Sequence, residues 1–242
     1  MIIVSVLLAF VFVGIGFLIT EKNAKHLLSG YNTMTEEDRK NFNLIDYLKF
    51  FRKFHMFLGV SLLISSLLLF YFVDADYSGV FVGIYPIAAY IYFIWKGKRF
   101  NNMKDEQTKS SYLFALILMI VVLIGIVAMF TYGFQDNTVE IKEDVIQISG
   151  DYGMDLSINN IKSIELVNEL PEITSKINGF ALETIEKGLF RTNDDKEVKL
   201  LINSQNKPFI LISTKTNEKI YYSSKTKSNQ EIYNQLIEVL KK

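Results

Sequence analysis

The chain has no cysteine, only two histidines and only three prolines in 242 residues. The lack of cysteine excludes disulfides, zinc–thiolate and iron–sulfur sites, and a cysteine nucleophile. The histidines, His26 and His55, are too far apart for helical spacing to join them as metal ligands. The net charge at pH 7 is zero, which gives no reason to expect nucleic acid as a partner.

Catalytic motifs are also scarce. Residues 134–242 contain no histidine, which removes the commonest general base and the Ser-His-Asp arrangement. No nucleophile elbow, phosphate-binding loop or dinucleotide fingerprint occurs. The acidic groups at Glu36-Glu37-Asp38 and Asp194-Asp195 are explained by helix capping and turn formation. We therefore expect no catalytic residue, no cofactor and no metal, in a chain that is not an enzyme.

What the sequence does contain is a series of long apolar runs in its first 133 residues. A helix needs about 20 apolar residues to cross a bilayer. The third run is short and contains Pro86, which a membrane helix tolerates. The first run has no preceding Lys or Arg and is too long for a cleaved signal peptide, which favours an uncleaved anchor. We predict four transmembrane helices, over residues 2–19, 54–73, 79–95 and 112–133.

The basic residues alternate between the connecting segments. Asp74–Ser78 contains none, whereas both neighbouring connections are basic. Because positive loops remain in the cytoplasm, Asp74–Ser78 and both termini are expected outside it. If residues 79–95 do not cross, residues 134–242 move to the cytoplasm. The basic residues are Lys22, Lys25, Arg39, Lys40, Lys49, Arg52 and Lys53 before the second run, and Lys96, Lys98, Arg99, Lys104 and Lys109 after the third.

Residues 20–53 form a predicted cytoplasmic linker. Thr20–Ser29 is expected to continue the first helix, and Gly30 to end it, because glycine accepts the left-handed conformation. Thr35 begins a new helix as its cap. From Leu44 the pattern is amphipathic and predicts an interfacial helix that leads into the second span. Candidate contacts to the membrane surface or a partner are Lys49, Arg52, Lys53, Lys96, Lys98 and Arg99, although a topology signal alone also explains them and is favoured.

The segment Gly16–Phe54 resembles an uncharacterised family of small bacterial membrane proteins. The resemblance rests on Leu28-Ser29-Gly30-Tyr31-Asn32-Thr33-Met34-Thr35 and on Glu36-Glu37. It implies location and layout, since that family has no assigned activity.

Small residues at helical spacing within the spans are candidates for close helix packing. They are Ser61 with Ser65, and Gly79 with Gly83. Packing within one bundle is favoured over dimerisation. The predicted spans contain no charged residue, whereas transport pathways usually contain ionisable groups.

Residues 134–242 alternate apolar and polar side chains, as half-buried strands do. The predicted strands are Thr138–Lys142, Val145–Ser149, Ile161–Val167, Leu189–Thr192, Glu197–Asn203, Phe209–Thr214 and Lys219–Ser223. A closing helix follows a capping box of Ser228 and Glu231. Its predicted buried stripe is Ile232, Tyr233, Leu236, Ile237 and Leu240.

This part of the chain resembles bacterial pleckstrin-homology-like domains that are fused to membrane helices. The matching positions are Asn178-Gly179-Phe180, Gly188-Leu189-Phe190, Asp194-Asp195-Lys196, Pro208–Ile212 and the closing helix. The resemblance implies a domain that binds partners or lipid without catalysis. Glu143-Asp144 lies where a basic headgroup-binding cluster would be needed, so lipid-headgroup binding is not carried over.

The expected fold is therefore a membrane α-helical domain of four transmembrane helices, residues 1–133, and a mostly-β, pleckstrin-homology-like domain, residues 134–242. The expected function is a multi-pass protein of the bacterial cell membrane that presents this domain, outside the cytoplasm, for interaction, assembly or regulation. Its partners would be the lipid bilayer and a protein partner or a second copy. A small membrane transporter or channel component is the alternative.

Overall fold

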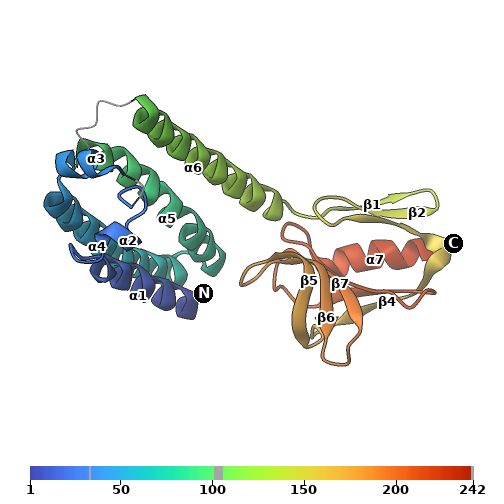
Figure 1. Ribbon diagram of the computed structural model, residues 1–242. Helices are drawn as coiled ribbons and strands as arrows, with labels where there is room; N and C mark the ends of the chain where they lie inside the picture. The colour runs from blue at the N-terminus through green and yellow to red at the C-terminus, as the bar shows by residue number, and fades with distance from the viewer. Residues whose placement is uncertain (33, 101–105, 241–242) are drawn as a thin grey trace. The chain divides into compact units, whose positions relative to one another are not determined.

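The computed structural model describes residues 1–32, 34–100 and 106–240, and the chain separates into two compact units, Met1–Ala128 and Met129–Lys242 (Figure 1). Thr33 of the sequence motif and Lys104 of the basic residues lie outside the described residues. Helix α6 begins in the first unit and ends in the second.

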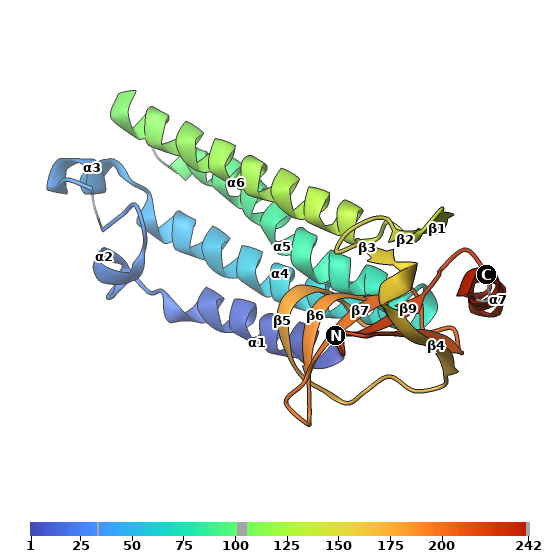
Figure 2. The ribbon, with the colours of Figure 1, turned by 90° about the vertical axis from the view of Figure 1, so that its right-hand side faces the viewer.

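The first unit is helical, and α1, α4 and α5 lie side by side in it (Figure 2). Its elements are α1 Ile2–Leu18, α2 Ala24–Leu27, α3 Glu36–Asn41, α4 Leu44–Phe72, α5 Ala75–Gly97, a 3-10 turn η1 at Lys98–Phe100, and the first part of α6 Glu106–Gly133.

Neighbouring helices in this unit run in opposite directions. Gly16, near the end of α1, packs on His55 of α4, whereas Ala9 packs on Gly59 farther along α4. On the other side of α4, the rings of Phe50 and Phe93 stack 5.2 Å apart. The first third of α4 therefore lies beside the end of α5.

Among the described residues, three helices are long and apolar enough to cross a membrane, and these are Leu44–Phe72, Ala75–Phe100 and Tyr112–Gly133. Helix α1 is apolar but shorter, at 17 residues. Pro86 lies inside α5, as the sequence predicts. Many large apolar side chains of these helices face outward, as lipid-solvated helices require.

Three details of the helical part differ from the sequence predictions. Thr20–Ser29 does not continue α1, because the Asn23 side chain accepts a hydrogen bond from Thr20 N (2.7 Å) and donates one to Leu18 O (2.9 Å), which turns the chain. Asp74–Ser78 is not a loop, because Asp74 accepts from Asp76 N (2.8 Å) and so starts α5 at Ala75. The expected interfacial helix and second span are one continuous helix, α4.

Two local features of the linker are as predicted. Gly30 has a φ of 87°, in the left-handed region, although it does not end the first helix, because α1 ends at Leu18 and α2 at Leu27. Thr35 caps α3, and its hydroxyl oxygen accepts a hydrogen bond from Asp38 N at 3.2 Å.

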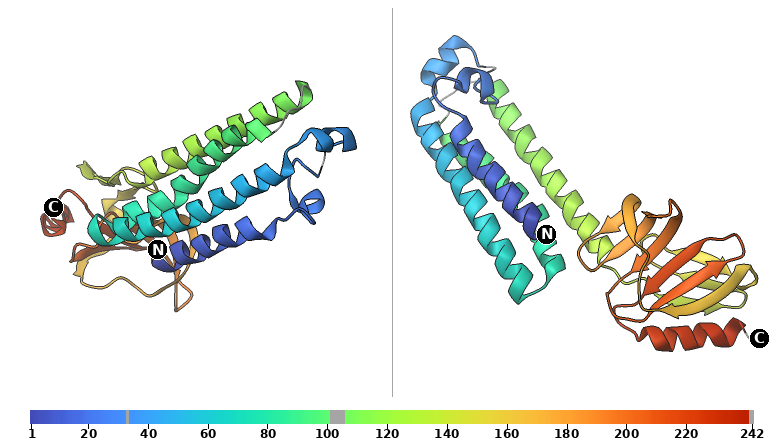
Figure 3. Two further views of the ribbon diagram at one scale, coloured as in Figure 1. Left: turned by 90° about the vertical axis from the view of Figure 1, so that its left-hand side faces the viewer. Right: turned by 90° about the horizontal axis from the view of Figure 1, so that it is seen from below.

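The second unit contains two sheets and a closing helix (Figure 3). The three-stranded sheet has the order β1-β2-β3 and the six-stranded sheet has the order β4-β8-β9-β7-β6-β5. All neighbours are antiparallel except β7 and β9. The elements are β1 Val139–Lys142, β2 Val145–Ile148, β3 Met154–Ser157, a 3-10 turn η2 at Ile158–Asn160, β4 Ile161–Val167, β5 Ile173–Ala181, β6 Glu186–Thr192, β7 Glu197–Ile202, β8 Phe209–Thr214, β9 Lys219–Ser223 and α7 Asn229–Leu240.

The six-stranded sheet buries side chains on both faces. On one face, Ile212 and Tyr222 join Ile146 of β2 and Leu236 of α7 in one core cluster. On the other, residues such as Phe190 and Leu211 pack with the segment that follows β4. The first cluster ties the small sheet and α7 to the large sheet.

The predicted strands and closing helix are all present. Ile232 and Leu236 are buried, and the other three residues of the predicted stripe pack against them. The sequence reading missed β3 and β5. Strand β3 alternates in burial but has only four residues and one buried side chain, Leu156. Strand β5 has no buried residue and lacks the alternation on which the prediction relied.

Candidate functional site

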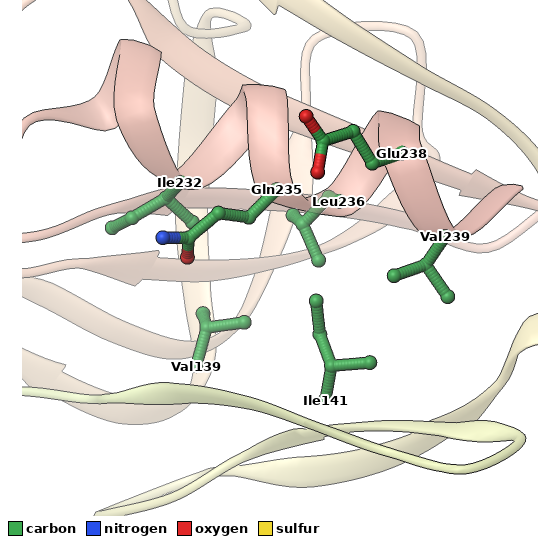
Figure 4. A pocket seen from close by; sticks show the side chains of 7 residues that line it. All are labelled: Val139, Ile141, Ile232, Gln235, Leu236, Glu238 and Val239. Carbon is green, nitrogen blue, oxygen red and sulfur yellow. The ribbon is translucent and has the colours of Figure 1, made fainter.

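The second unit has an apolar groove of about 400 Å³ between β1 and α7 (Figure 4). Val139 and Ile141 of β1 point toward α7, because alternate residues of a strand share a face. Buried Ile232 and Leu236 contribute from α7. The lining is completed by Gln235, Glu238 and Val239.

Strand β1 adds backbone groups to this site. It is the end strand of its sheet and pairs only with β2 among the described residues. Its second edge thus presents backbone N–H and C=O groups next to an apolar groove. This combination suits an extended segment that adds a strand and places alternate side chains in a pocket.

The sequence analysis predicted both elements that line this groove but did not predict that they lie next to each other. It predicted Val139 and Ile141 on a half-buried strand and Ile232 and Leu236 on a buried stripe. Gln235, Glu238 and Val239 were not predicted to line a site. The signal for Gln235 was its position three residues after Ile232 on an amphipathic helix.

A second feature is a series of polar contacts between α4 and α5 in the first unit. His55 Nε2 lies 3.0 Å from the Tyr90 hydroxyl, and the Ser61 and Tyr85 hydroxyls lie 2.6 Å apart. Farther along, Ser78 donates to Ser66 O at 2.9 Å. Such contacts fix the register of two packed helices.

His55 and Asp76 are buried in this unit, with 1% and 3% of their surfaces exposed. His55 Nδ1 lies 2.8 Å from Phe51 O, and the ring packs against Phe54 and Phe93. The sequence reading placed His55 at the edge of a span and Asp76 in a loop, so it missed both as buried groups.

The predicted packing residues have different environments. Ser61 bonds to Tyr85, Ser65 and Gly83 are half-buried, and Gly79 is buried. The tightest approach described in the helical unit is elsewhere: a Cβ built on Gly59 would lie 2.7 Å from Ala9 O. No local pattern marks Gly59, because its partner is on another helix.

The six predicted surface cations gather at one end of the α4–α5 pair, because the two helices are antiparallel. Lys96 is half-buried and the other five are exposed. Arg99 lies over the ring of Phe50 on α4, with its Cζ 5.5 Å from the ring centroid. The residues are Lys49, Arg52, Lys53, Lys96, Lys98 and Arg99.

A third feature is the polar network that holds the segment between α6 and β1. Asp136 accepts hydrogen bonds from the hydroxyls of Ser224 (3.1 Å) and Thr226 (2.8 Å). Asn137 donates from its backbone to Asn203 Oδ1 (3.1 Å) and from its side chain to Ser149 O (2.7 Å). These contacts attach the end of α6 firmly to the second unit.

Buried Lys187 belongs to the same network. Its ammonium group donates to Gln135 O, and it is fully buried. Burial lowers the pKa of Lys187 to about 8, against the opposing attraction of Asp136 and Asp151. The Tyr222 hydroxyl donates to Asn137 O at 2.6 Å, and burial raises the pKa of Tyr222. The burial of Lys187 and of Tyr222 is therefore explained by their role in anchoring the segment between α6 and β1.

Within the described part of the chain, no group of three or more His, Asp or Glu side chains is arranged to hold a metal ion.

Comparison with known proteins adds one match. Residues 6–101 match a family model described as "Domain of unknown function (DUF3784)". This confirms the predicted resemblance of the N-terminal region to a family without an assigned activity, over less than half of the chain. No curated protein and no solved structure matches the chain.

Proposed function

We propose that this chain is a non-enzymatic integral membrane protein whose C-terminal unit is a pleckstrin-homology-like interaction domain. Four crossings, by α1, α4, α5 and α6, would hold it at the bacterial membrane, with the C-terminal unit outside the cytoplasm. The three long apolar helices support the membrane location. Helix α1 has 17 residues, which is about the lower limit for a span, and it serves as the fourth crossing.

The pleckstrin-homology-like assignment rests on two sheets closed by a C-terminal helix. The described residues form nine strands, two more than the alternating sequence pattern predicted, and include the parallel β7–β9 pair.

The observation that carries the interaction function is the groove beside the free edge of β1. An extended segment of a protein partner would pair with the backbone of β1 and place apolar side chains against Ile141 and Val239. Glu238 at the groove gives a basic residue of the partner an ion-pairing position.

Photocrosslinking in the host cells tests this function. A photoreactive residue at Gln235 in the groove should crosslink a discrete partner. The same residue at Gln230, which is exposed on α7 but does not line the groove, should not. Val139→Asp should remove the crosslink by placing a charge in the groove. Equal crosslinking at both positions, or none at Gln235, would contradict the proposed site. A product of twice the chain mass would identify a second copy as the partner.

A transporter or channel component is the second candidate, and buried His55 and Asp76 favour it. The polar contacts do not form a continuous path, because His55 and Ser61 are separated by about 9 Å of helix rise. Flux through proteoliposomes that is lost in His55→Phe would support this candidate over the first.

A further inference from the structure

We propose that the cations at the end of the α4–α5 pair form a binding site for the phosphodiester headgroup of an anionic phospholipid. This inference concerns the first unit, and it rests on the membrane location proposed above. The six side chains come from α4, from the end of α5 and from η1, which follows it. These elements meet because α4 and α5 are antiparallel: Asn43 N donates to Phe100 O at 3.3 Å, and Phe50 stacks on Phe93.

Among the side chains that the structure describes, the charge at this end is largely unpaired. Lys49 pairs with Asp46 at 3.0 Å, with both side chains more than half exposed. Among the described side chains, no carboxylate pairs with the other five cations. The three acids of the nearby linker, Glu36–Asp38, lie in the first turn of α3, where the helix dipole stabilises them. An anionic ligand is therefore favoured here.

Arg99 has the geometry of a phosphate-binding arginine. Its Cζ lies 4.6 Å from the ring centroid of Phe100 and 5.5 Å from that of Phe50. Both rings lie within cation–π distance of the guanidinium group. Its N–H groups can donate two parallel hydrogen bonds to a phosphate. Lys53 lies on α4 three residues after Phe50 and supplies a second positive charge near the same ring.

The surroundings indicate a lipid and not a free anion. Tyr92 and Trp95 are 49% and 58% exposed, next to Lys96, and such rings mark the headgroup level of a bilayer. One step deeper, α4 presents an exposed apolar stripe at helical spacing, which would accommodate acyl chains. The stripe is Phe57, Val60, Ile64 and Leu68.

Lipid retention by the full-length chain tests the site. The chain is placed in nanodiscs of equimolar phosphatidylglycerol and phosphatidylcholine and transferred to mild detergent. The bound lipids are then counted by native mass spectrometry. We expect phosphatidylglycerol to be retained severalfold over phosphatidylcholine. Lys53→Gln with Arg99→Gln should lower that ratio to near one, because each charge contributes to the attraction of an anionic lipid. Arg99→Lys should lose part of it, because an ammonium group cannot bond in the same bidentate way.

The matched control is Lys207→Gln with Lys227→Gln, which removes the same charge from the second unit and should leave the ratio unchanged. Equal retention of both lipids by the wild-type chain overturns the site. The site is also overturned if inorganic phosphate stabilises the chain as much as phosphatidylglycerol does, because that would mean a site for free anions. A chain that does not insert into nanodiscs contradicts the membrane location itself, whereas one that inserts without lipid preference contradicts this site alone.

Discussion

Tyr221 and Tyr222 are adjacent on β9 and face opposite sides of the six-stranded sheet, so each belongs to a different core cluster. The Tyr222 hydroxyl donates to Asn137 O, in the segment that leaves α6. Tyr221 is also buried, but its hydroxyl has no hydrogen-bond partner among the described residues. A comparison of the two tyrosines therefore separates the contribution of one anchoring hydrogen bond to stability from the contribution of a buried ring.

Tyr222→Phe should destabilise the second unit by about 1–3 kcal/mol, because it leaves the buried Asn137 carbonyl without its donor. Tyr221→Phe should change stability by less than about 0.5 kcal/mol. Hydrogen exchange of peptides from residues 134–242, in the full-length chain, measures both. Equal effects of the two substitutions would mean that the hydroxyl of Tyr222 contributes nothing to the anchor.

Single residues also show which features can be predicted from the sequence and which cannot. The cap at Thr35 and the left-handed Gly30 were predictable because their causes lie within a few residues. The burial of His55 and Asp76 depends on neighbouring helices and had no local signal. Asp74 was misread as part of a loop, although an acidic residue directly before an apolar run is also a helix cap.

At the scale of elements, α1 and α4 can lie in close contact because Gly59 has no side chain. A Cβ on Gly59 would lie 2.7 Å from Ala9 O and 2.8 Å from Val13 Cγ2. Gly14, on α1, has no atom within 4 Å of its built Cβ, so it provides a control with the same chemistry.

Gly59→Ala should weaken the packing of α1 on α4 by about 1–3 kcal/mol, because backbone must move to accept the methyl group. Gly14→Ala should be neutral or slightly stabilising, since alanine favours the helix. Thermal unfolding in one detergent, followed by the fluorescence of the single tryptophan, Trp95, compares the two. If both variants gain stability, the close approach at Gly59 is not a packing constraint.

Buried elements with a long apolar pattern were the most predictable, although exposed β1 was also predicted and β3, with buried Leu156, was not. Strands β8 and β9 have the predicted bounds, because their side chains alternate or are continuously apolar. Strand β5 is an exposed edge strand and has no such pattern. The groove was out of reach for a related reason: β1 and α7 were both predicted, but no sequence pattern states which helix meets which strand.

At the scale of the whole molecule, the number of crossings decides on which side the groove is found. Asp74 precedes α5, and Lys227 follows α6 in the second unit. If α5 and α6 both cross, Asp74 and Lys227 lie on the same side of the membrane. Lys25, between α1 and α4, should then lie on the opposite side, where positive loops are retained.

Cysteine labelling can settle this count, because the chain has no native thiol. Asp74→Cys and Lys227→Cys, both at exposed positions, should react with a membrane-impermeant maleimide in intact cells. Lys25→Cys, also exposed, should react only after permeabilisation. Reaction at position 74 without reaction at 227 would mean that only one of α5 and α6 crosses. The groove would then face the cytoplasm, and the partner to be sought by crosslinking at Gln235 would be a cytoplasmic protein.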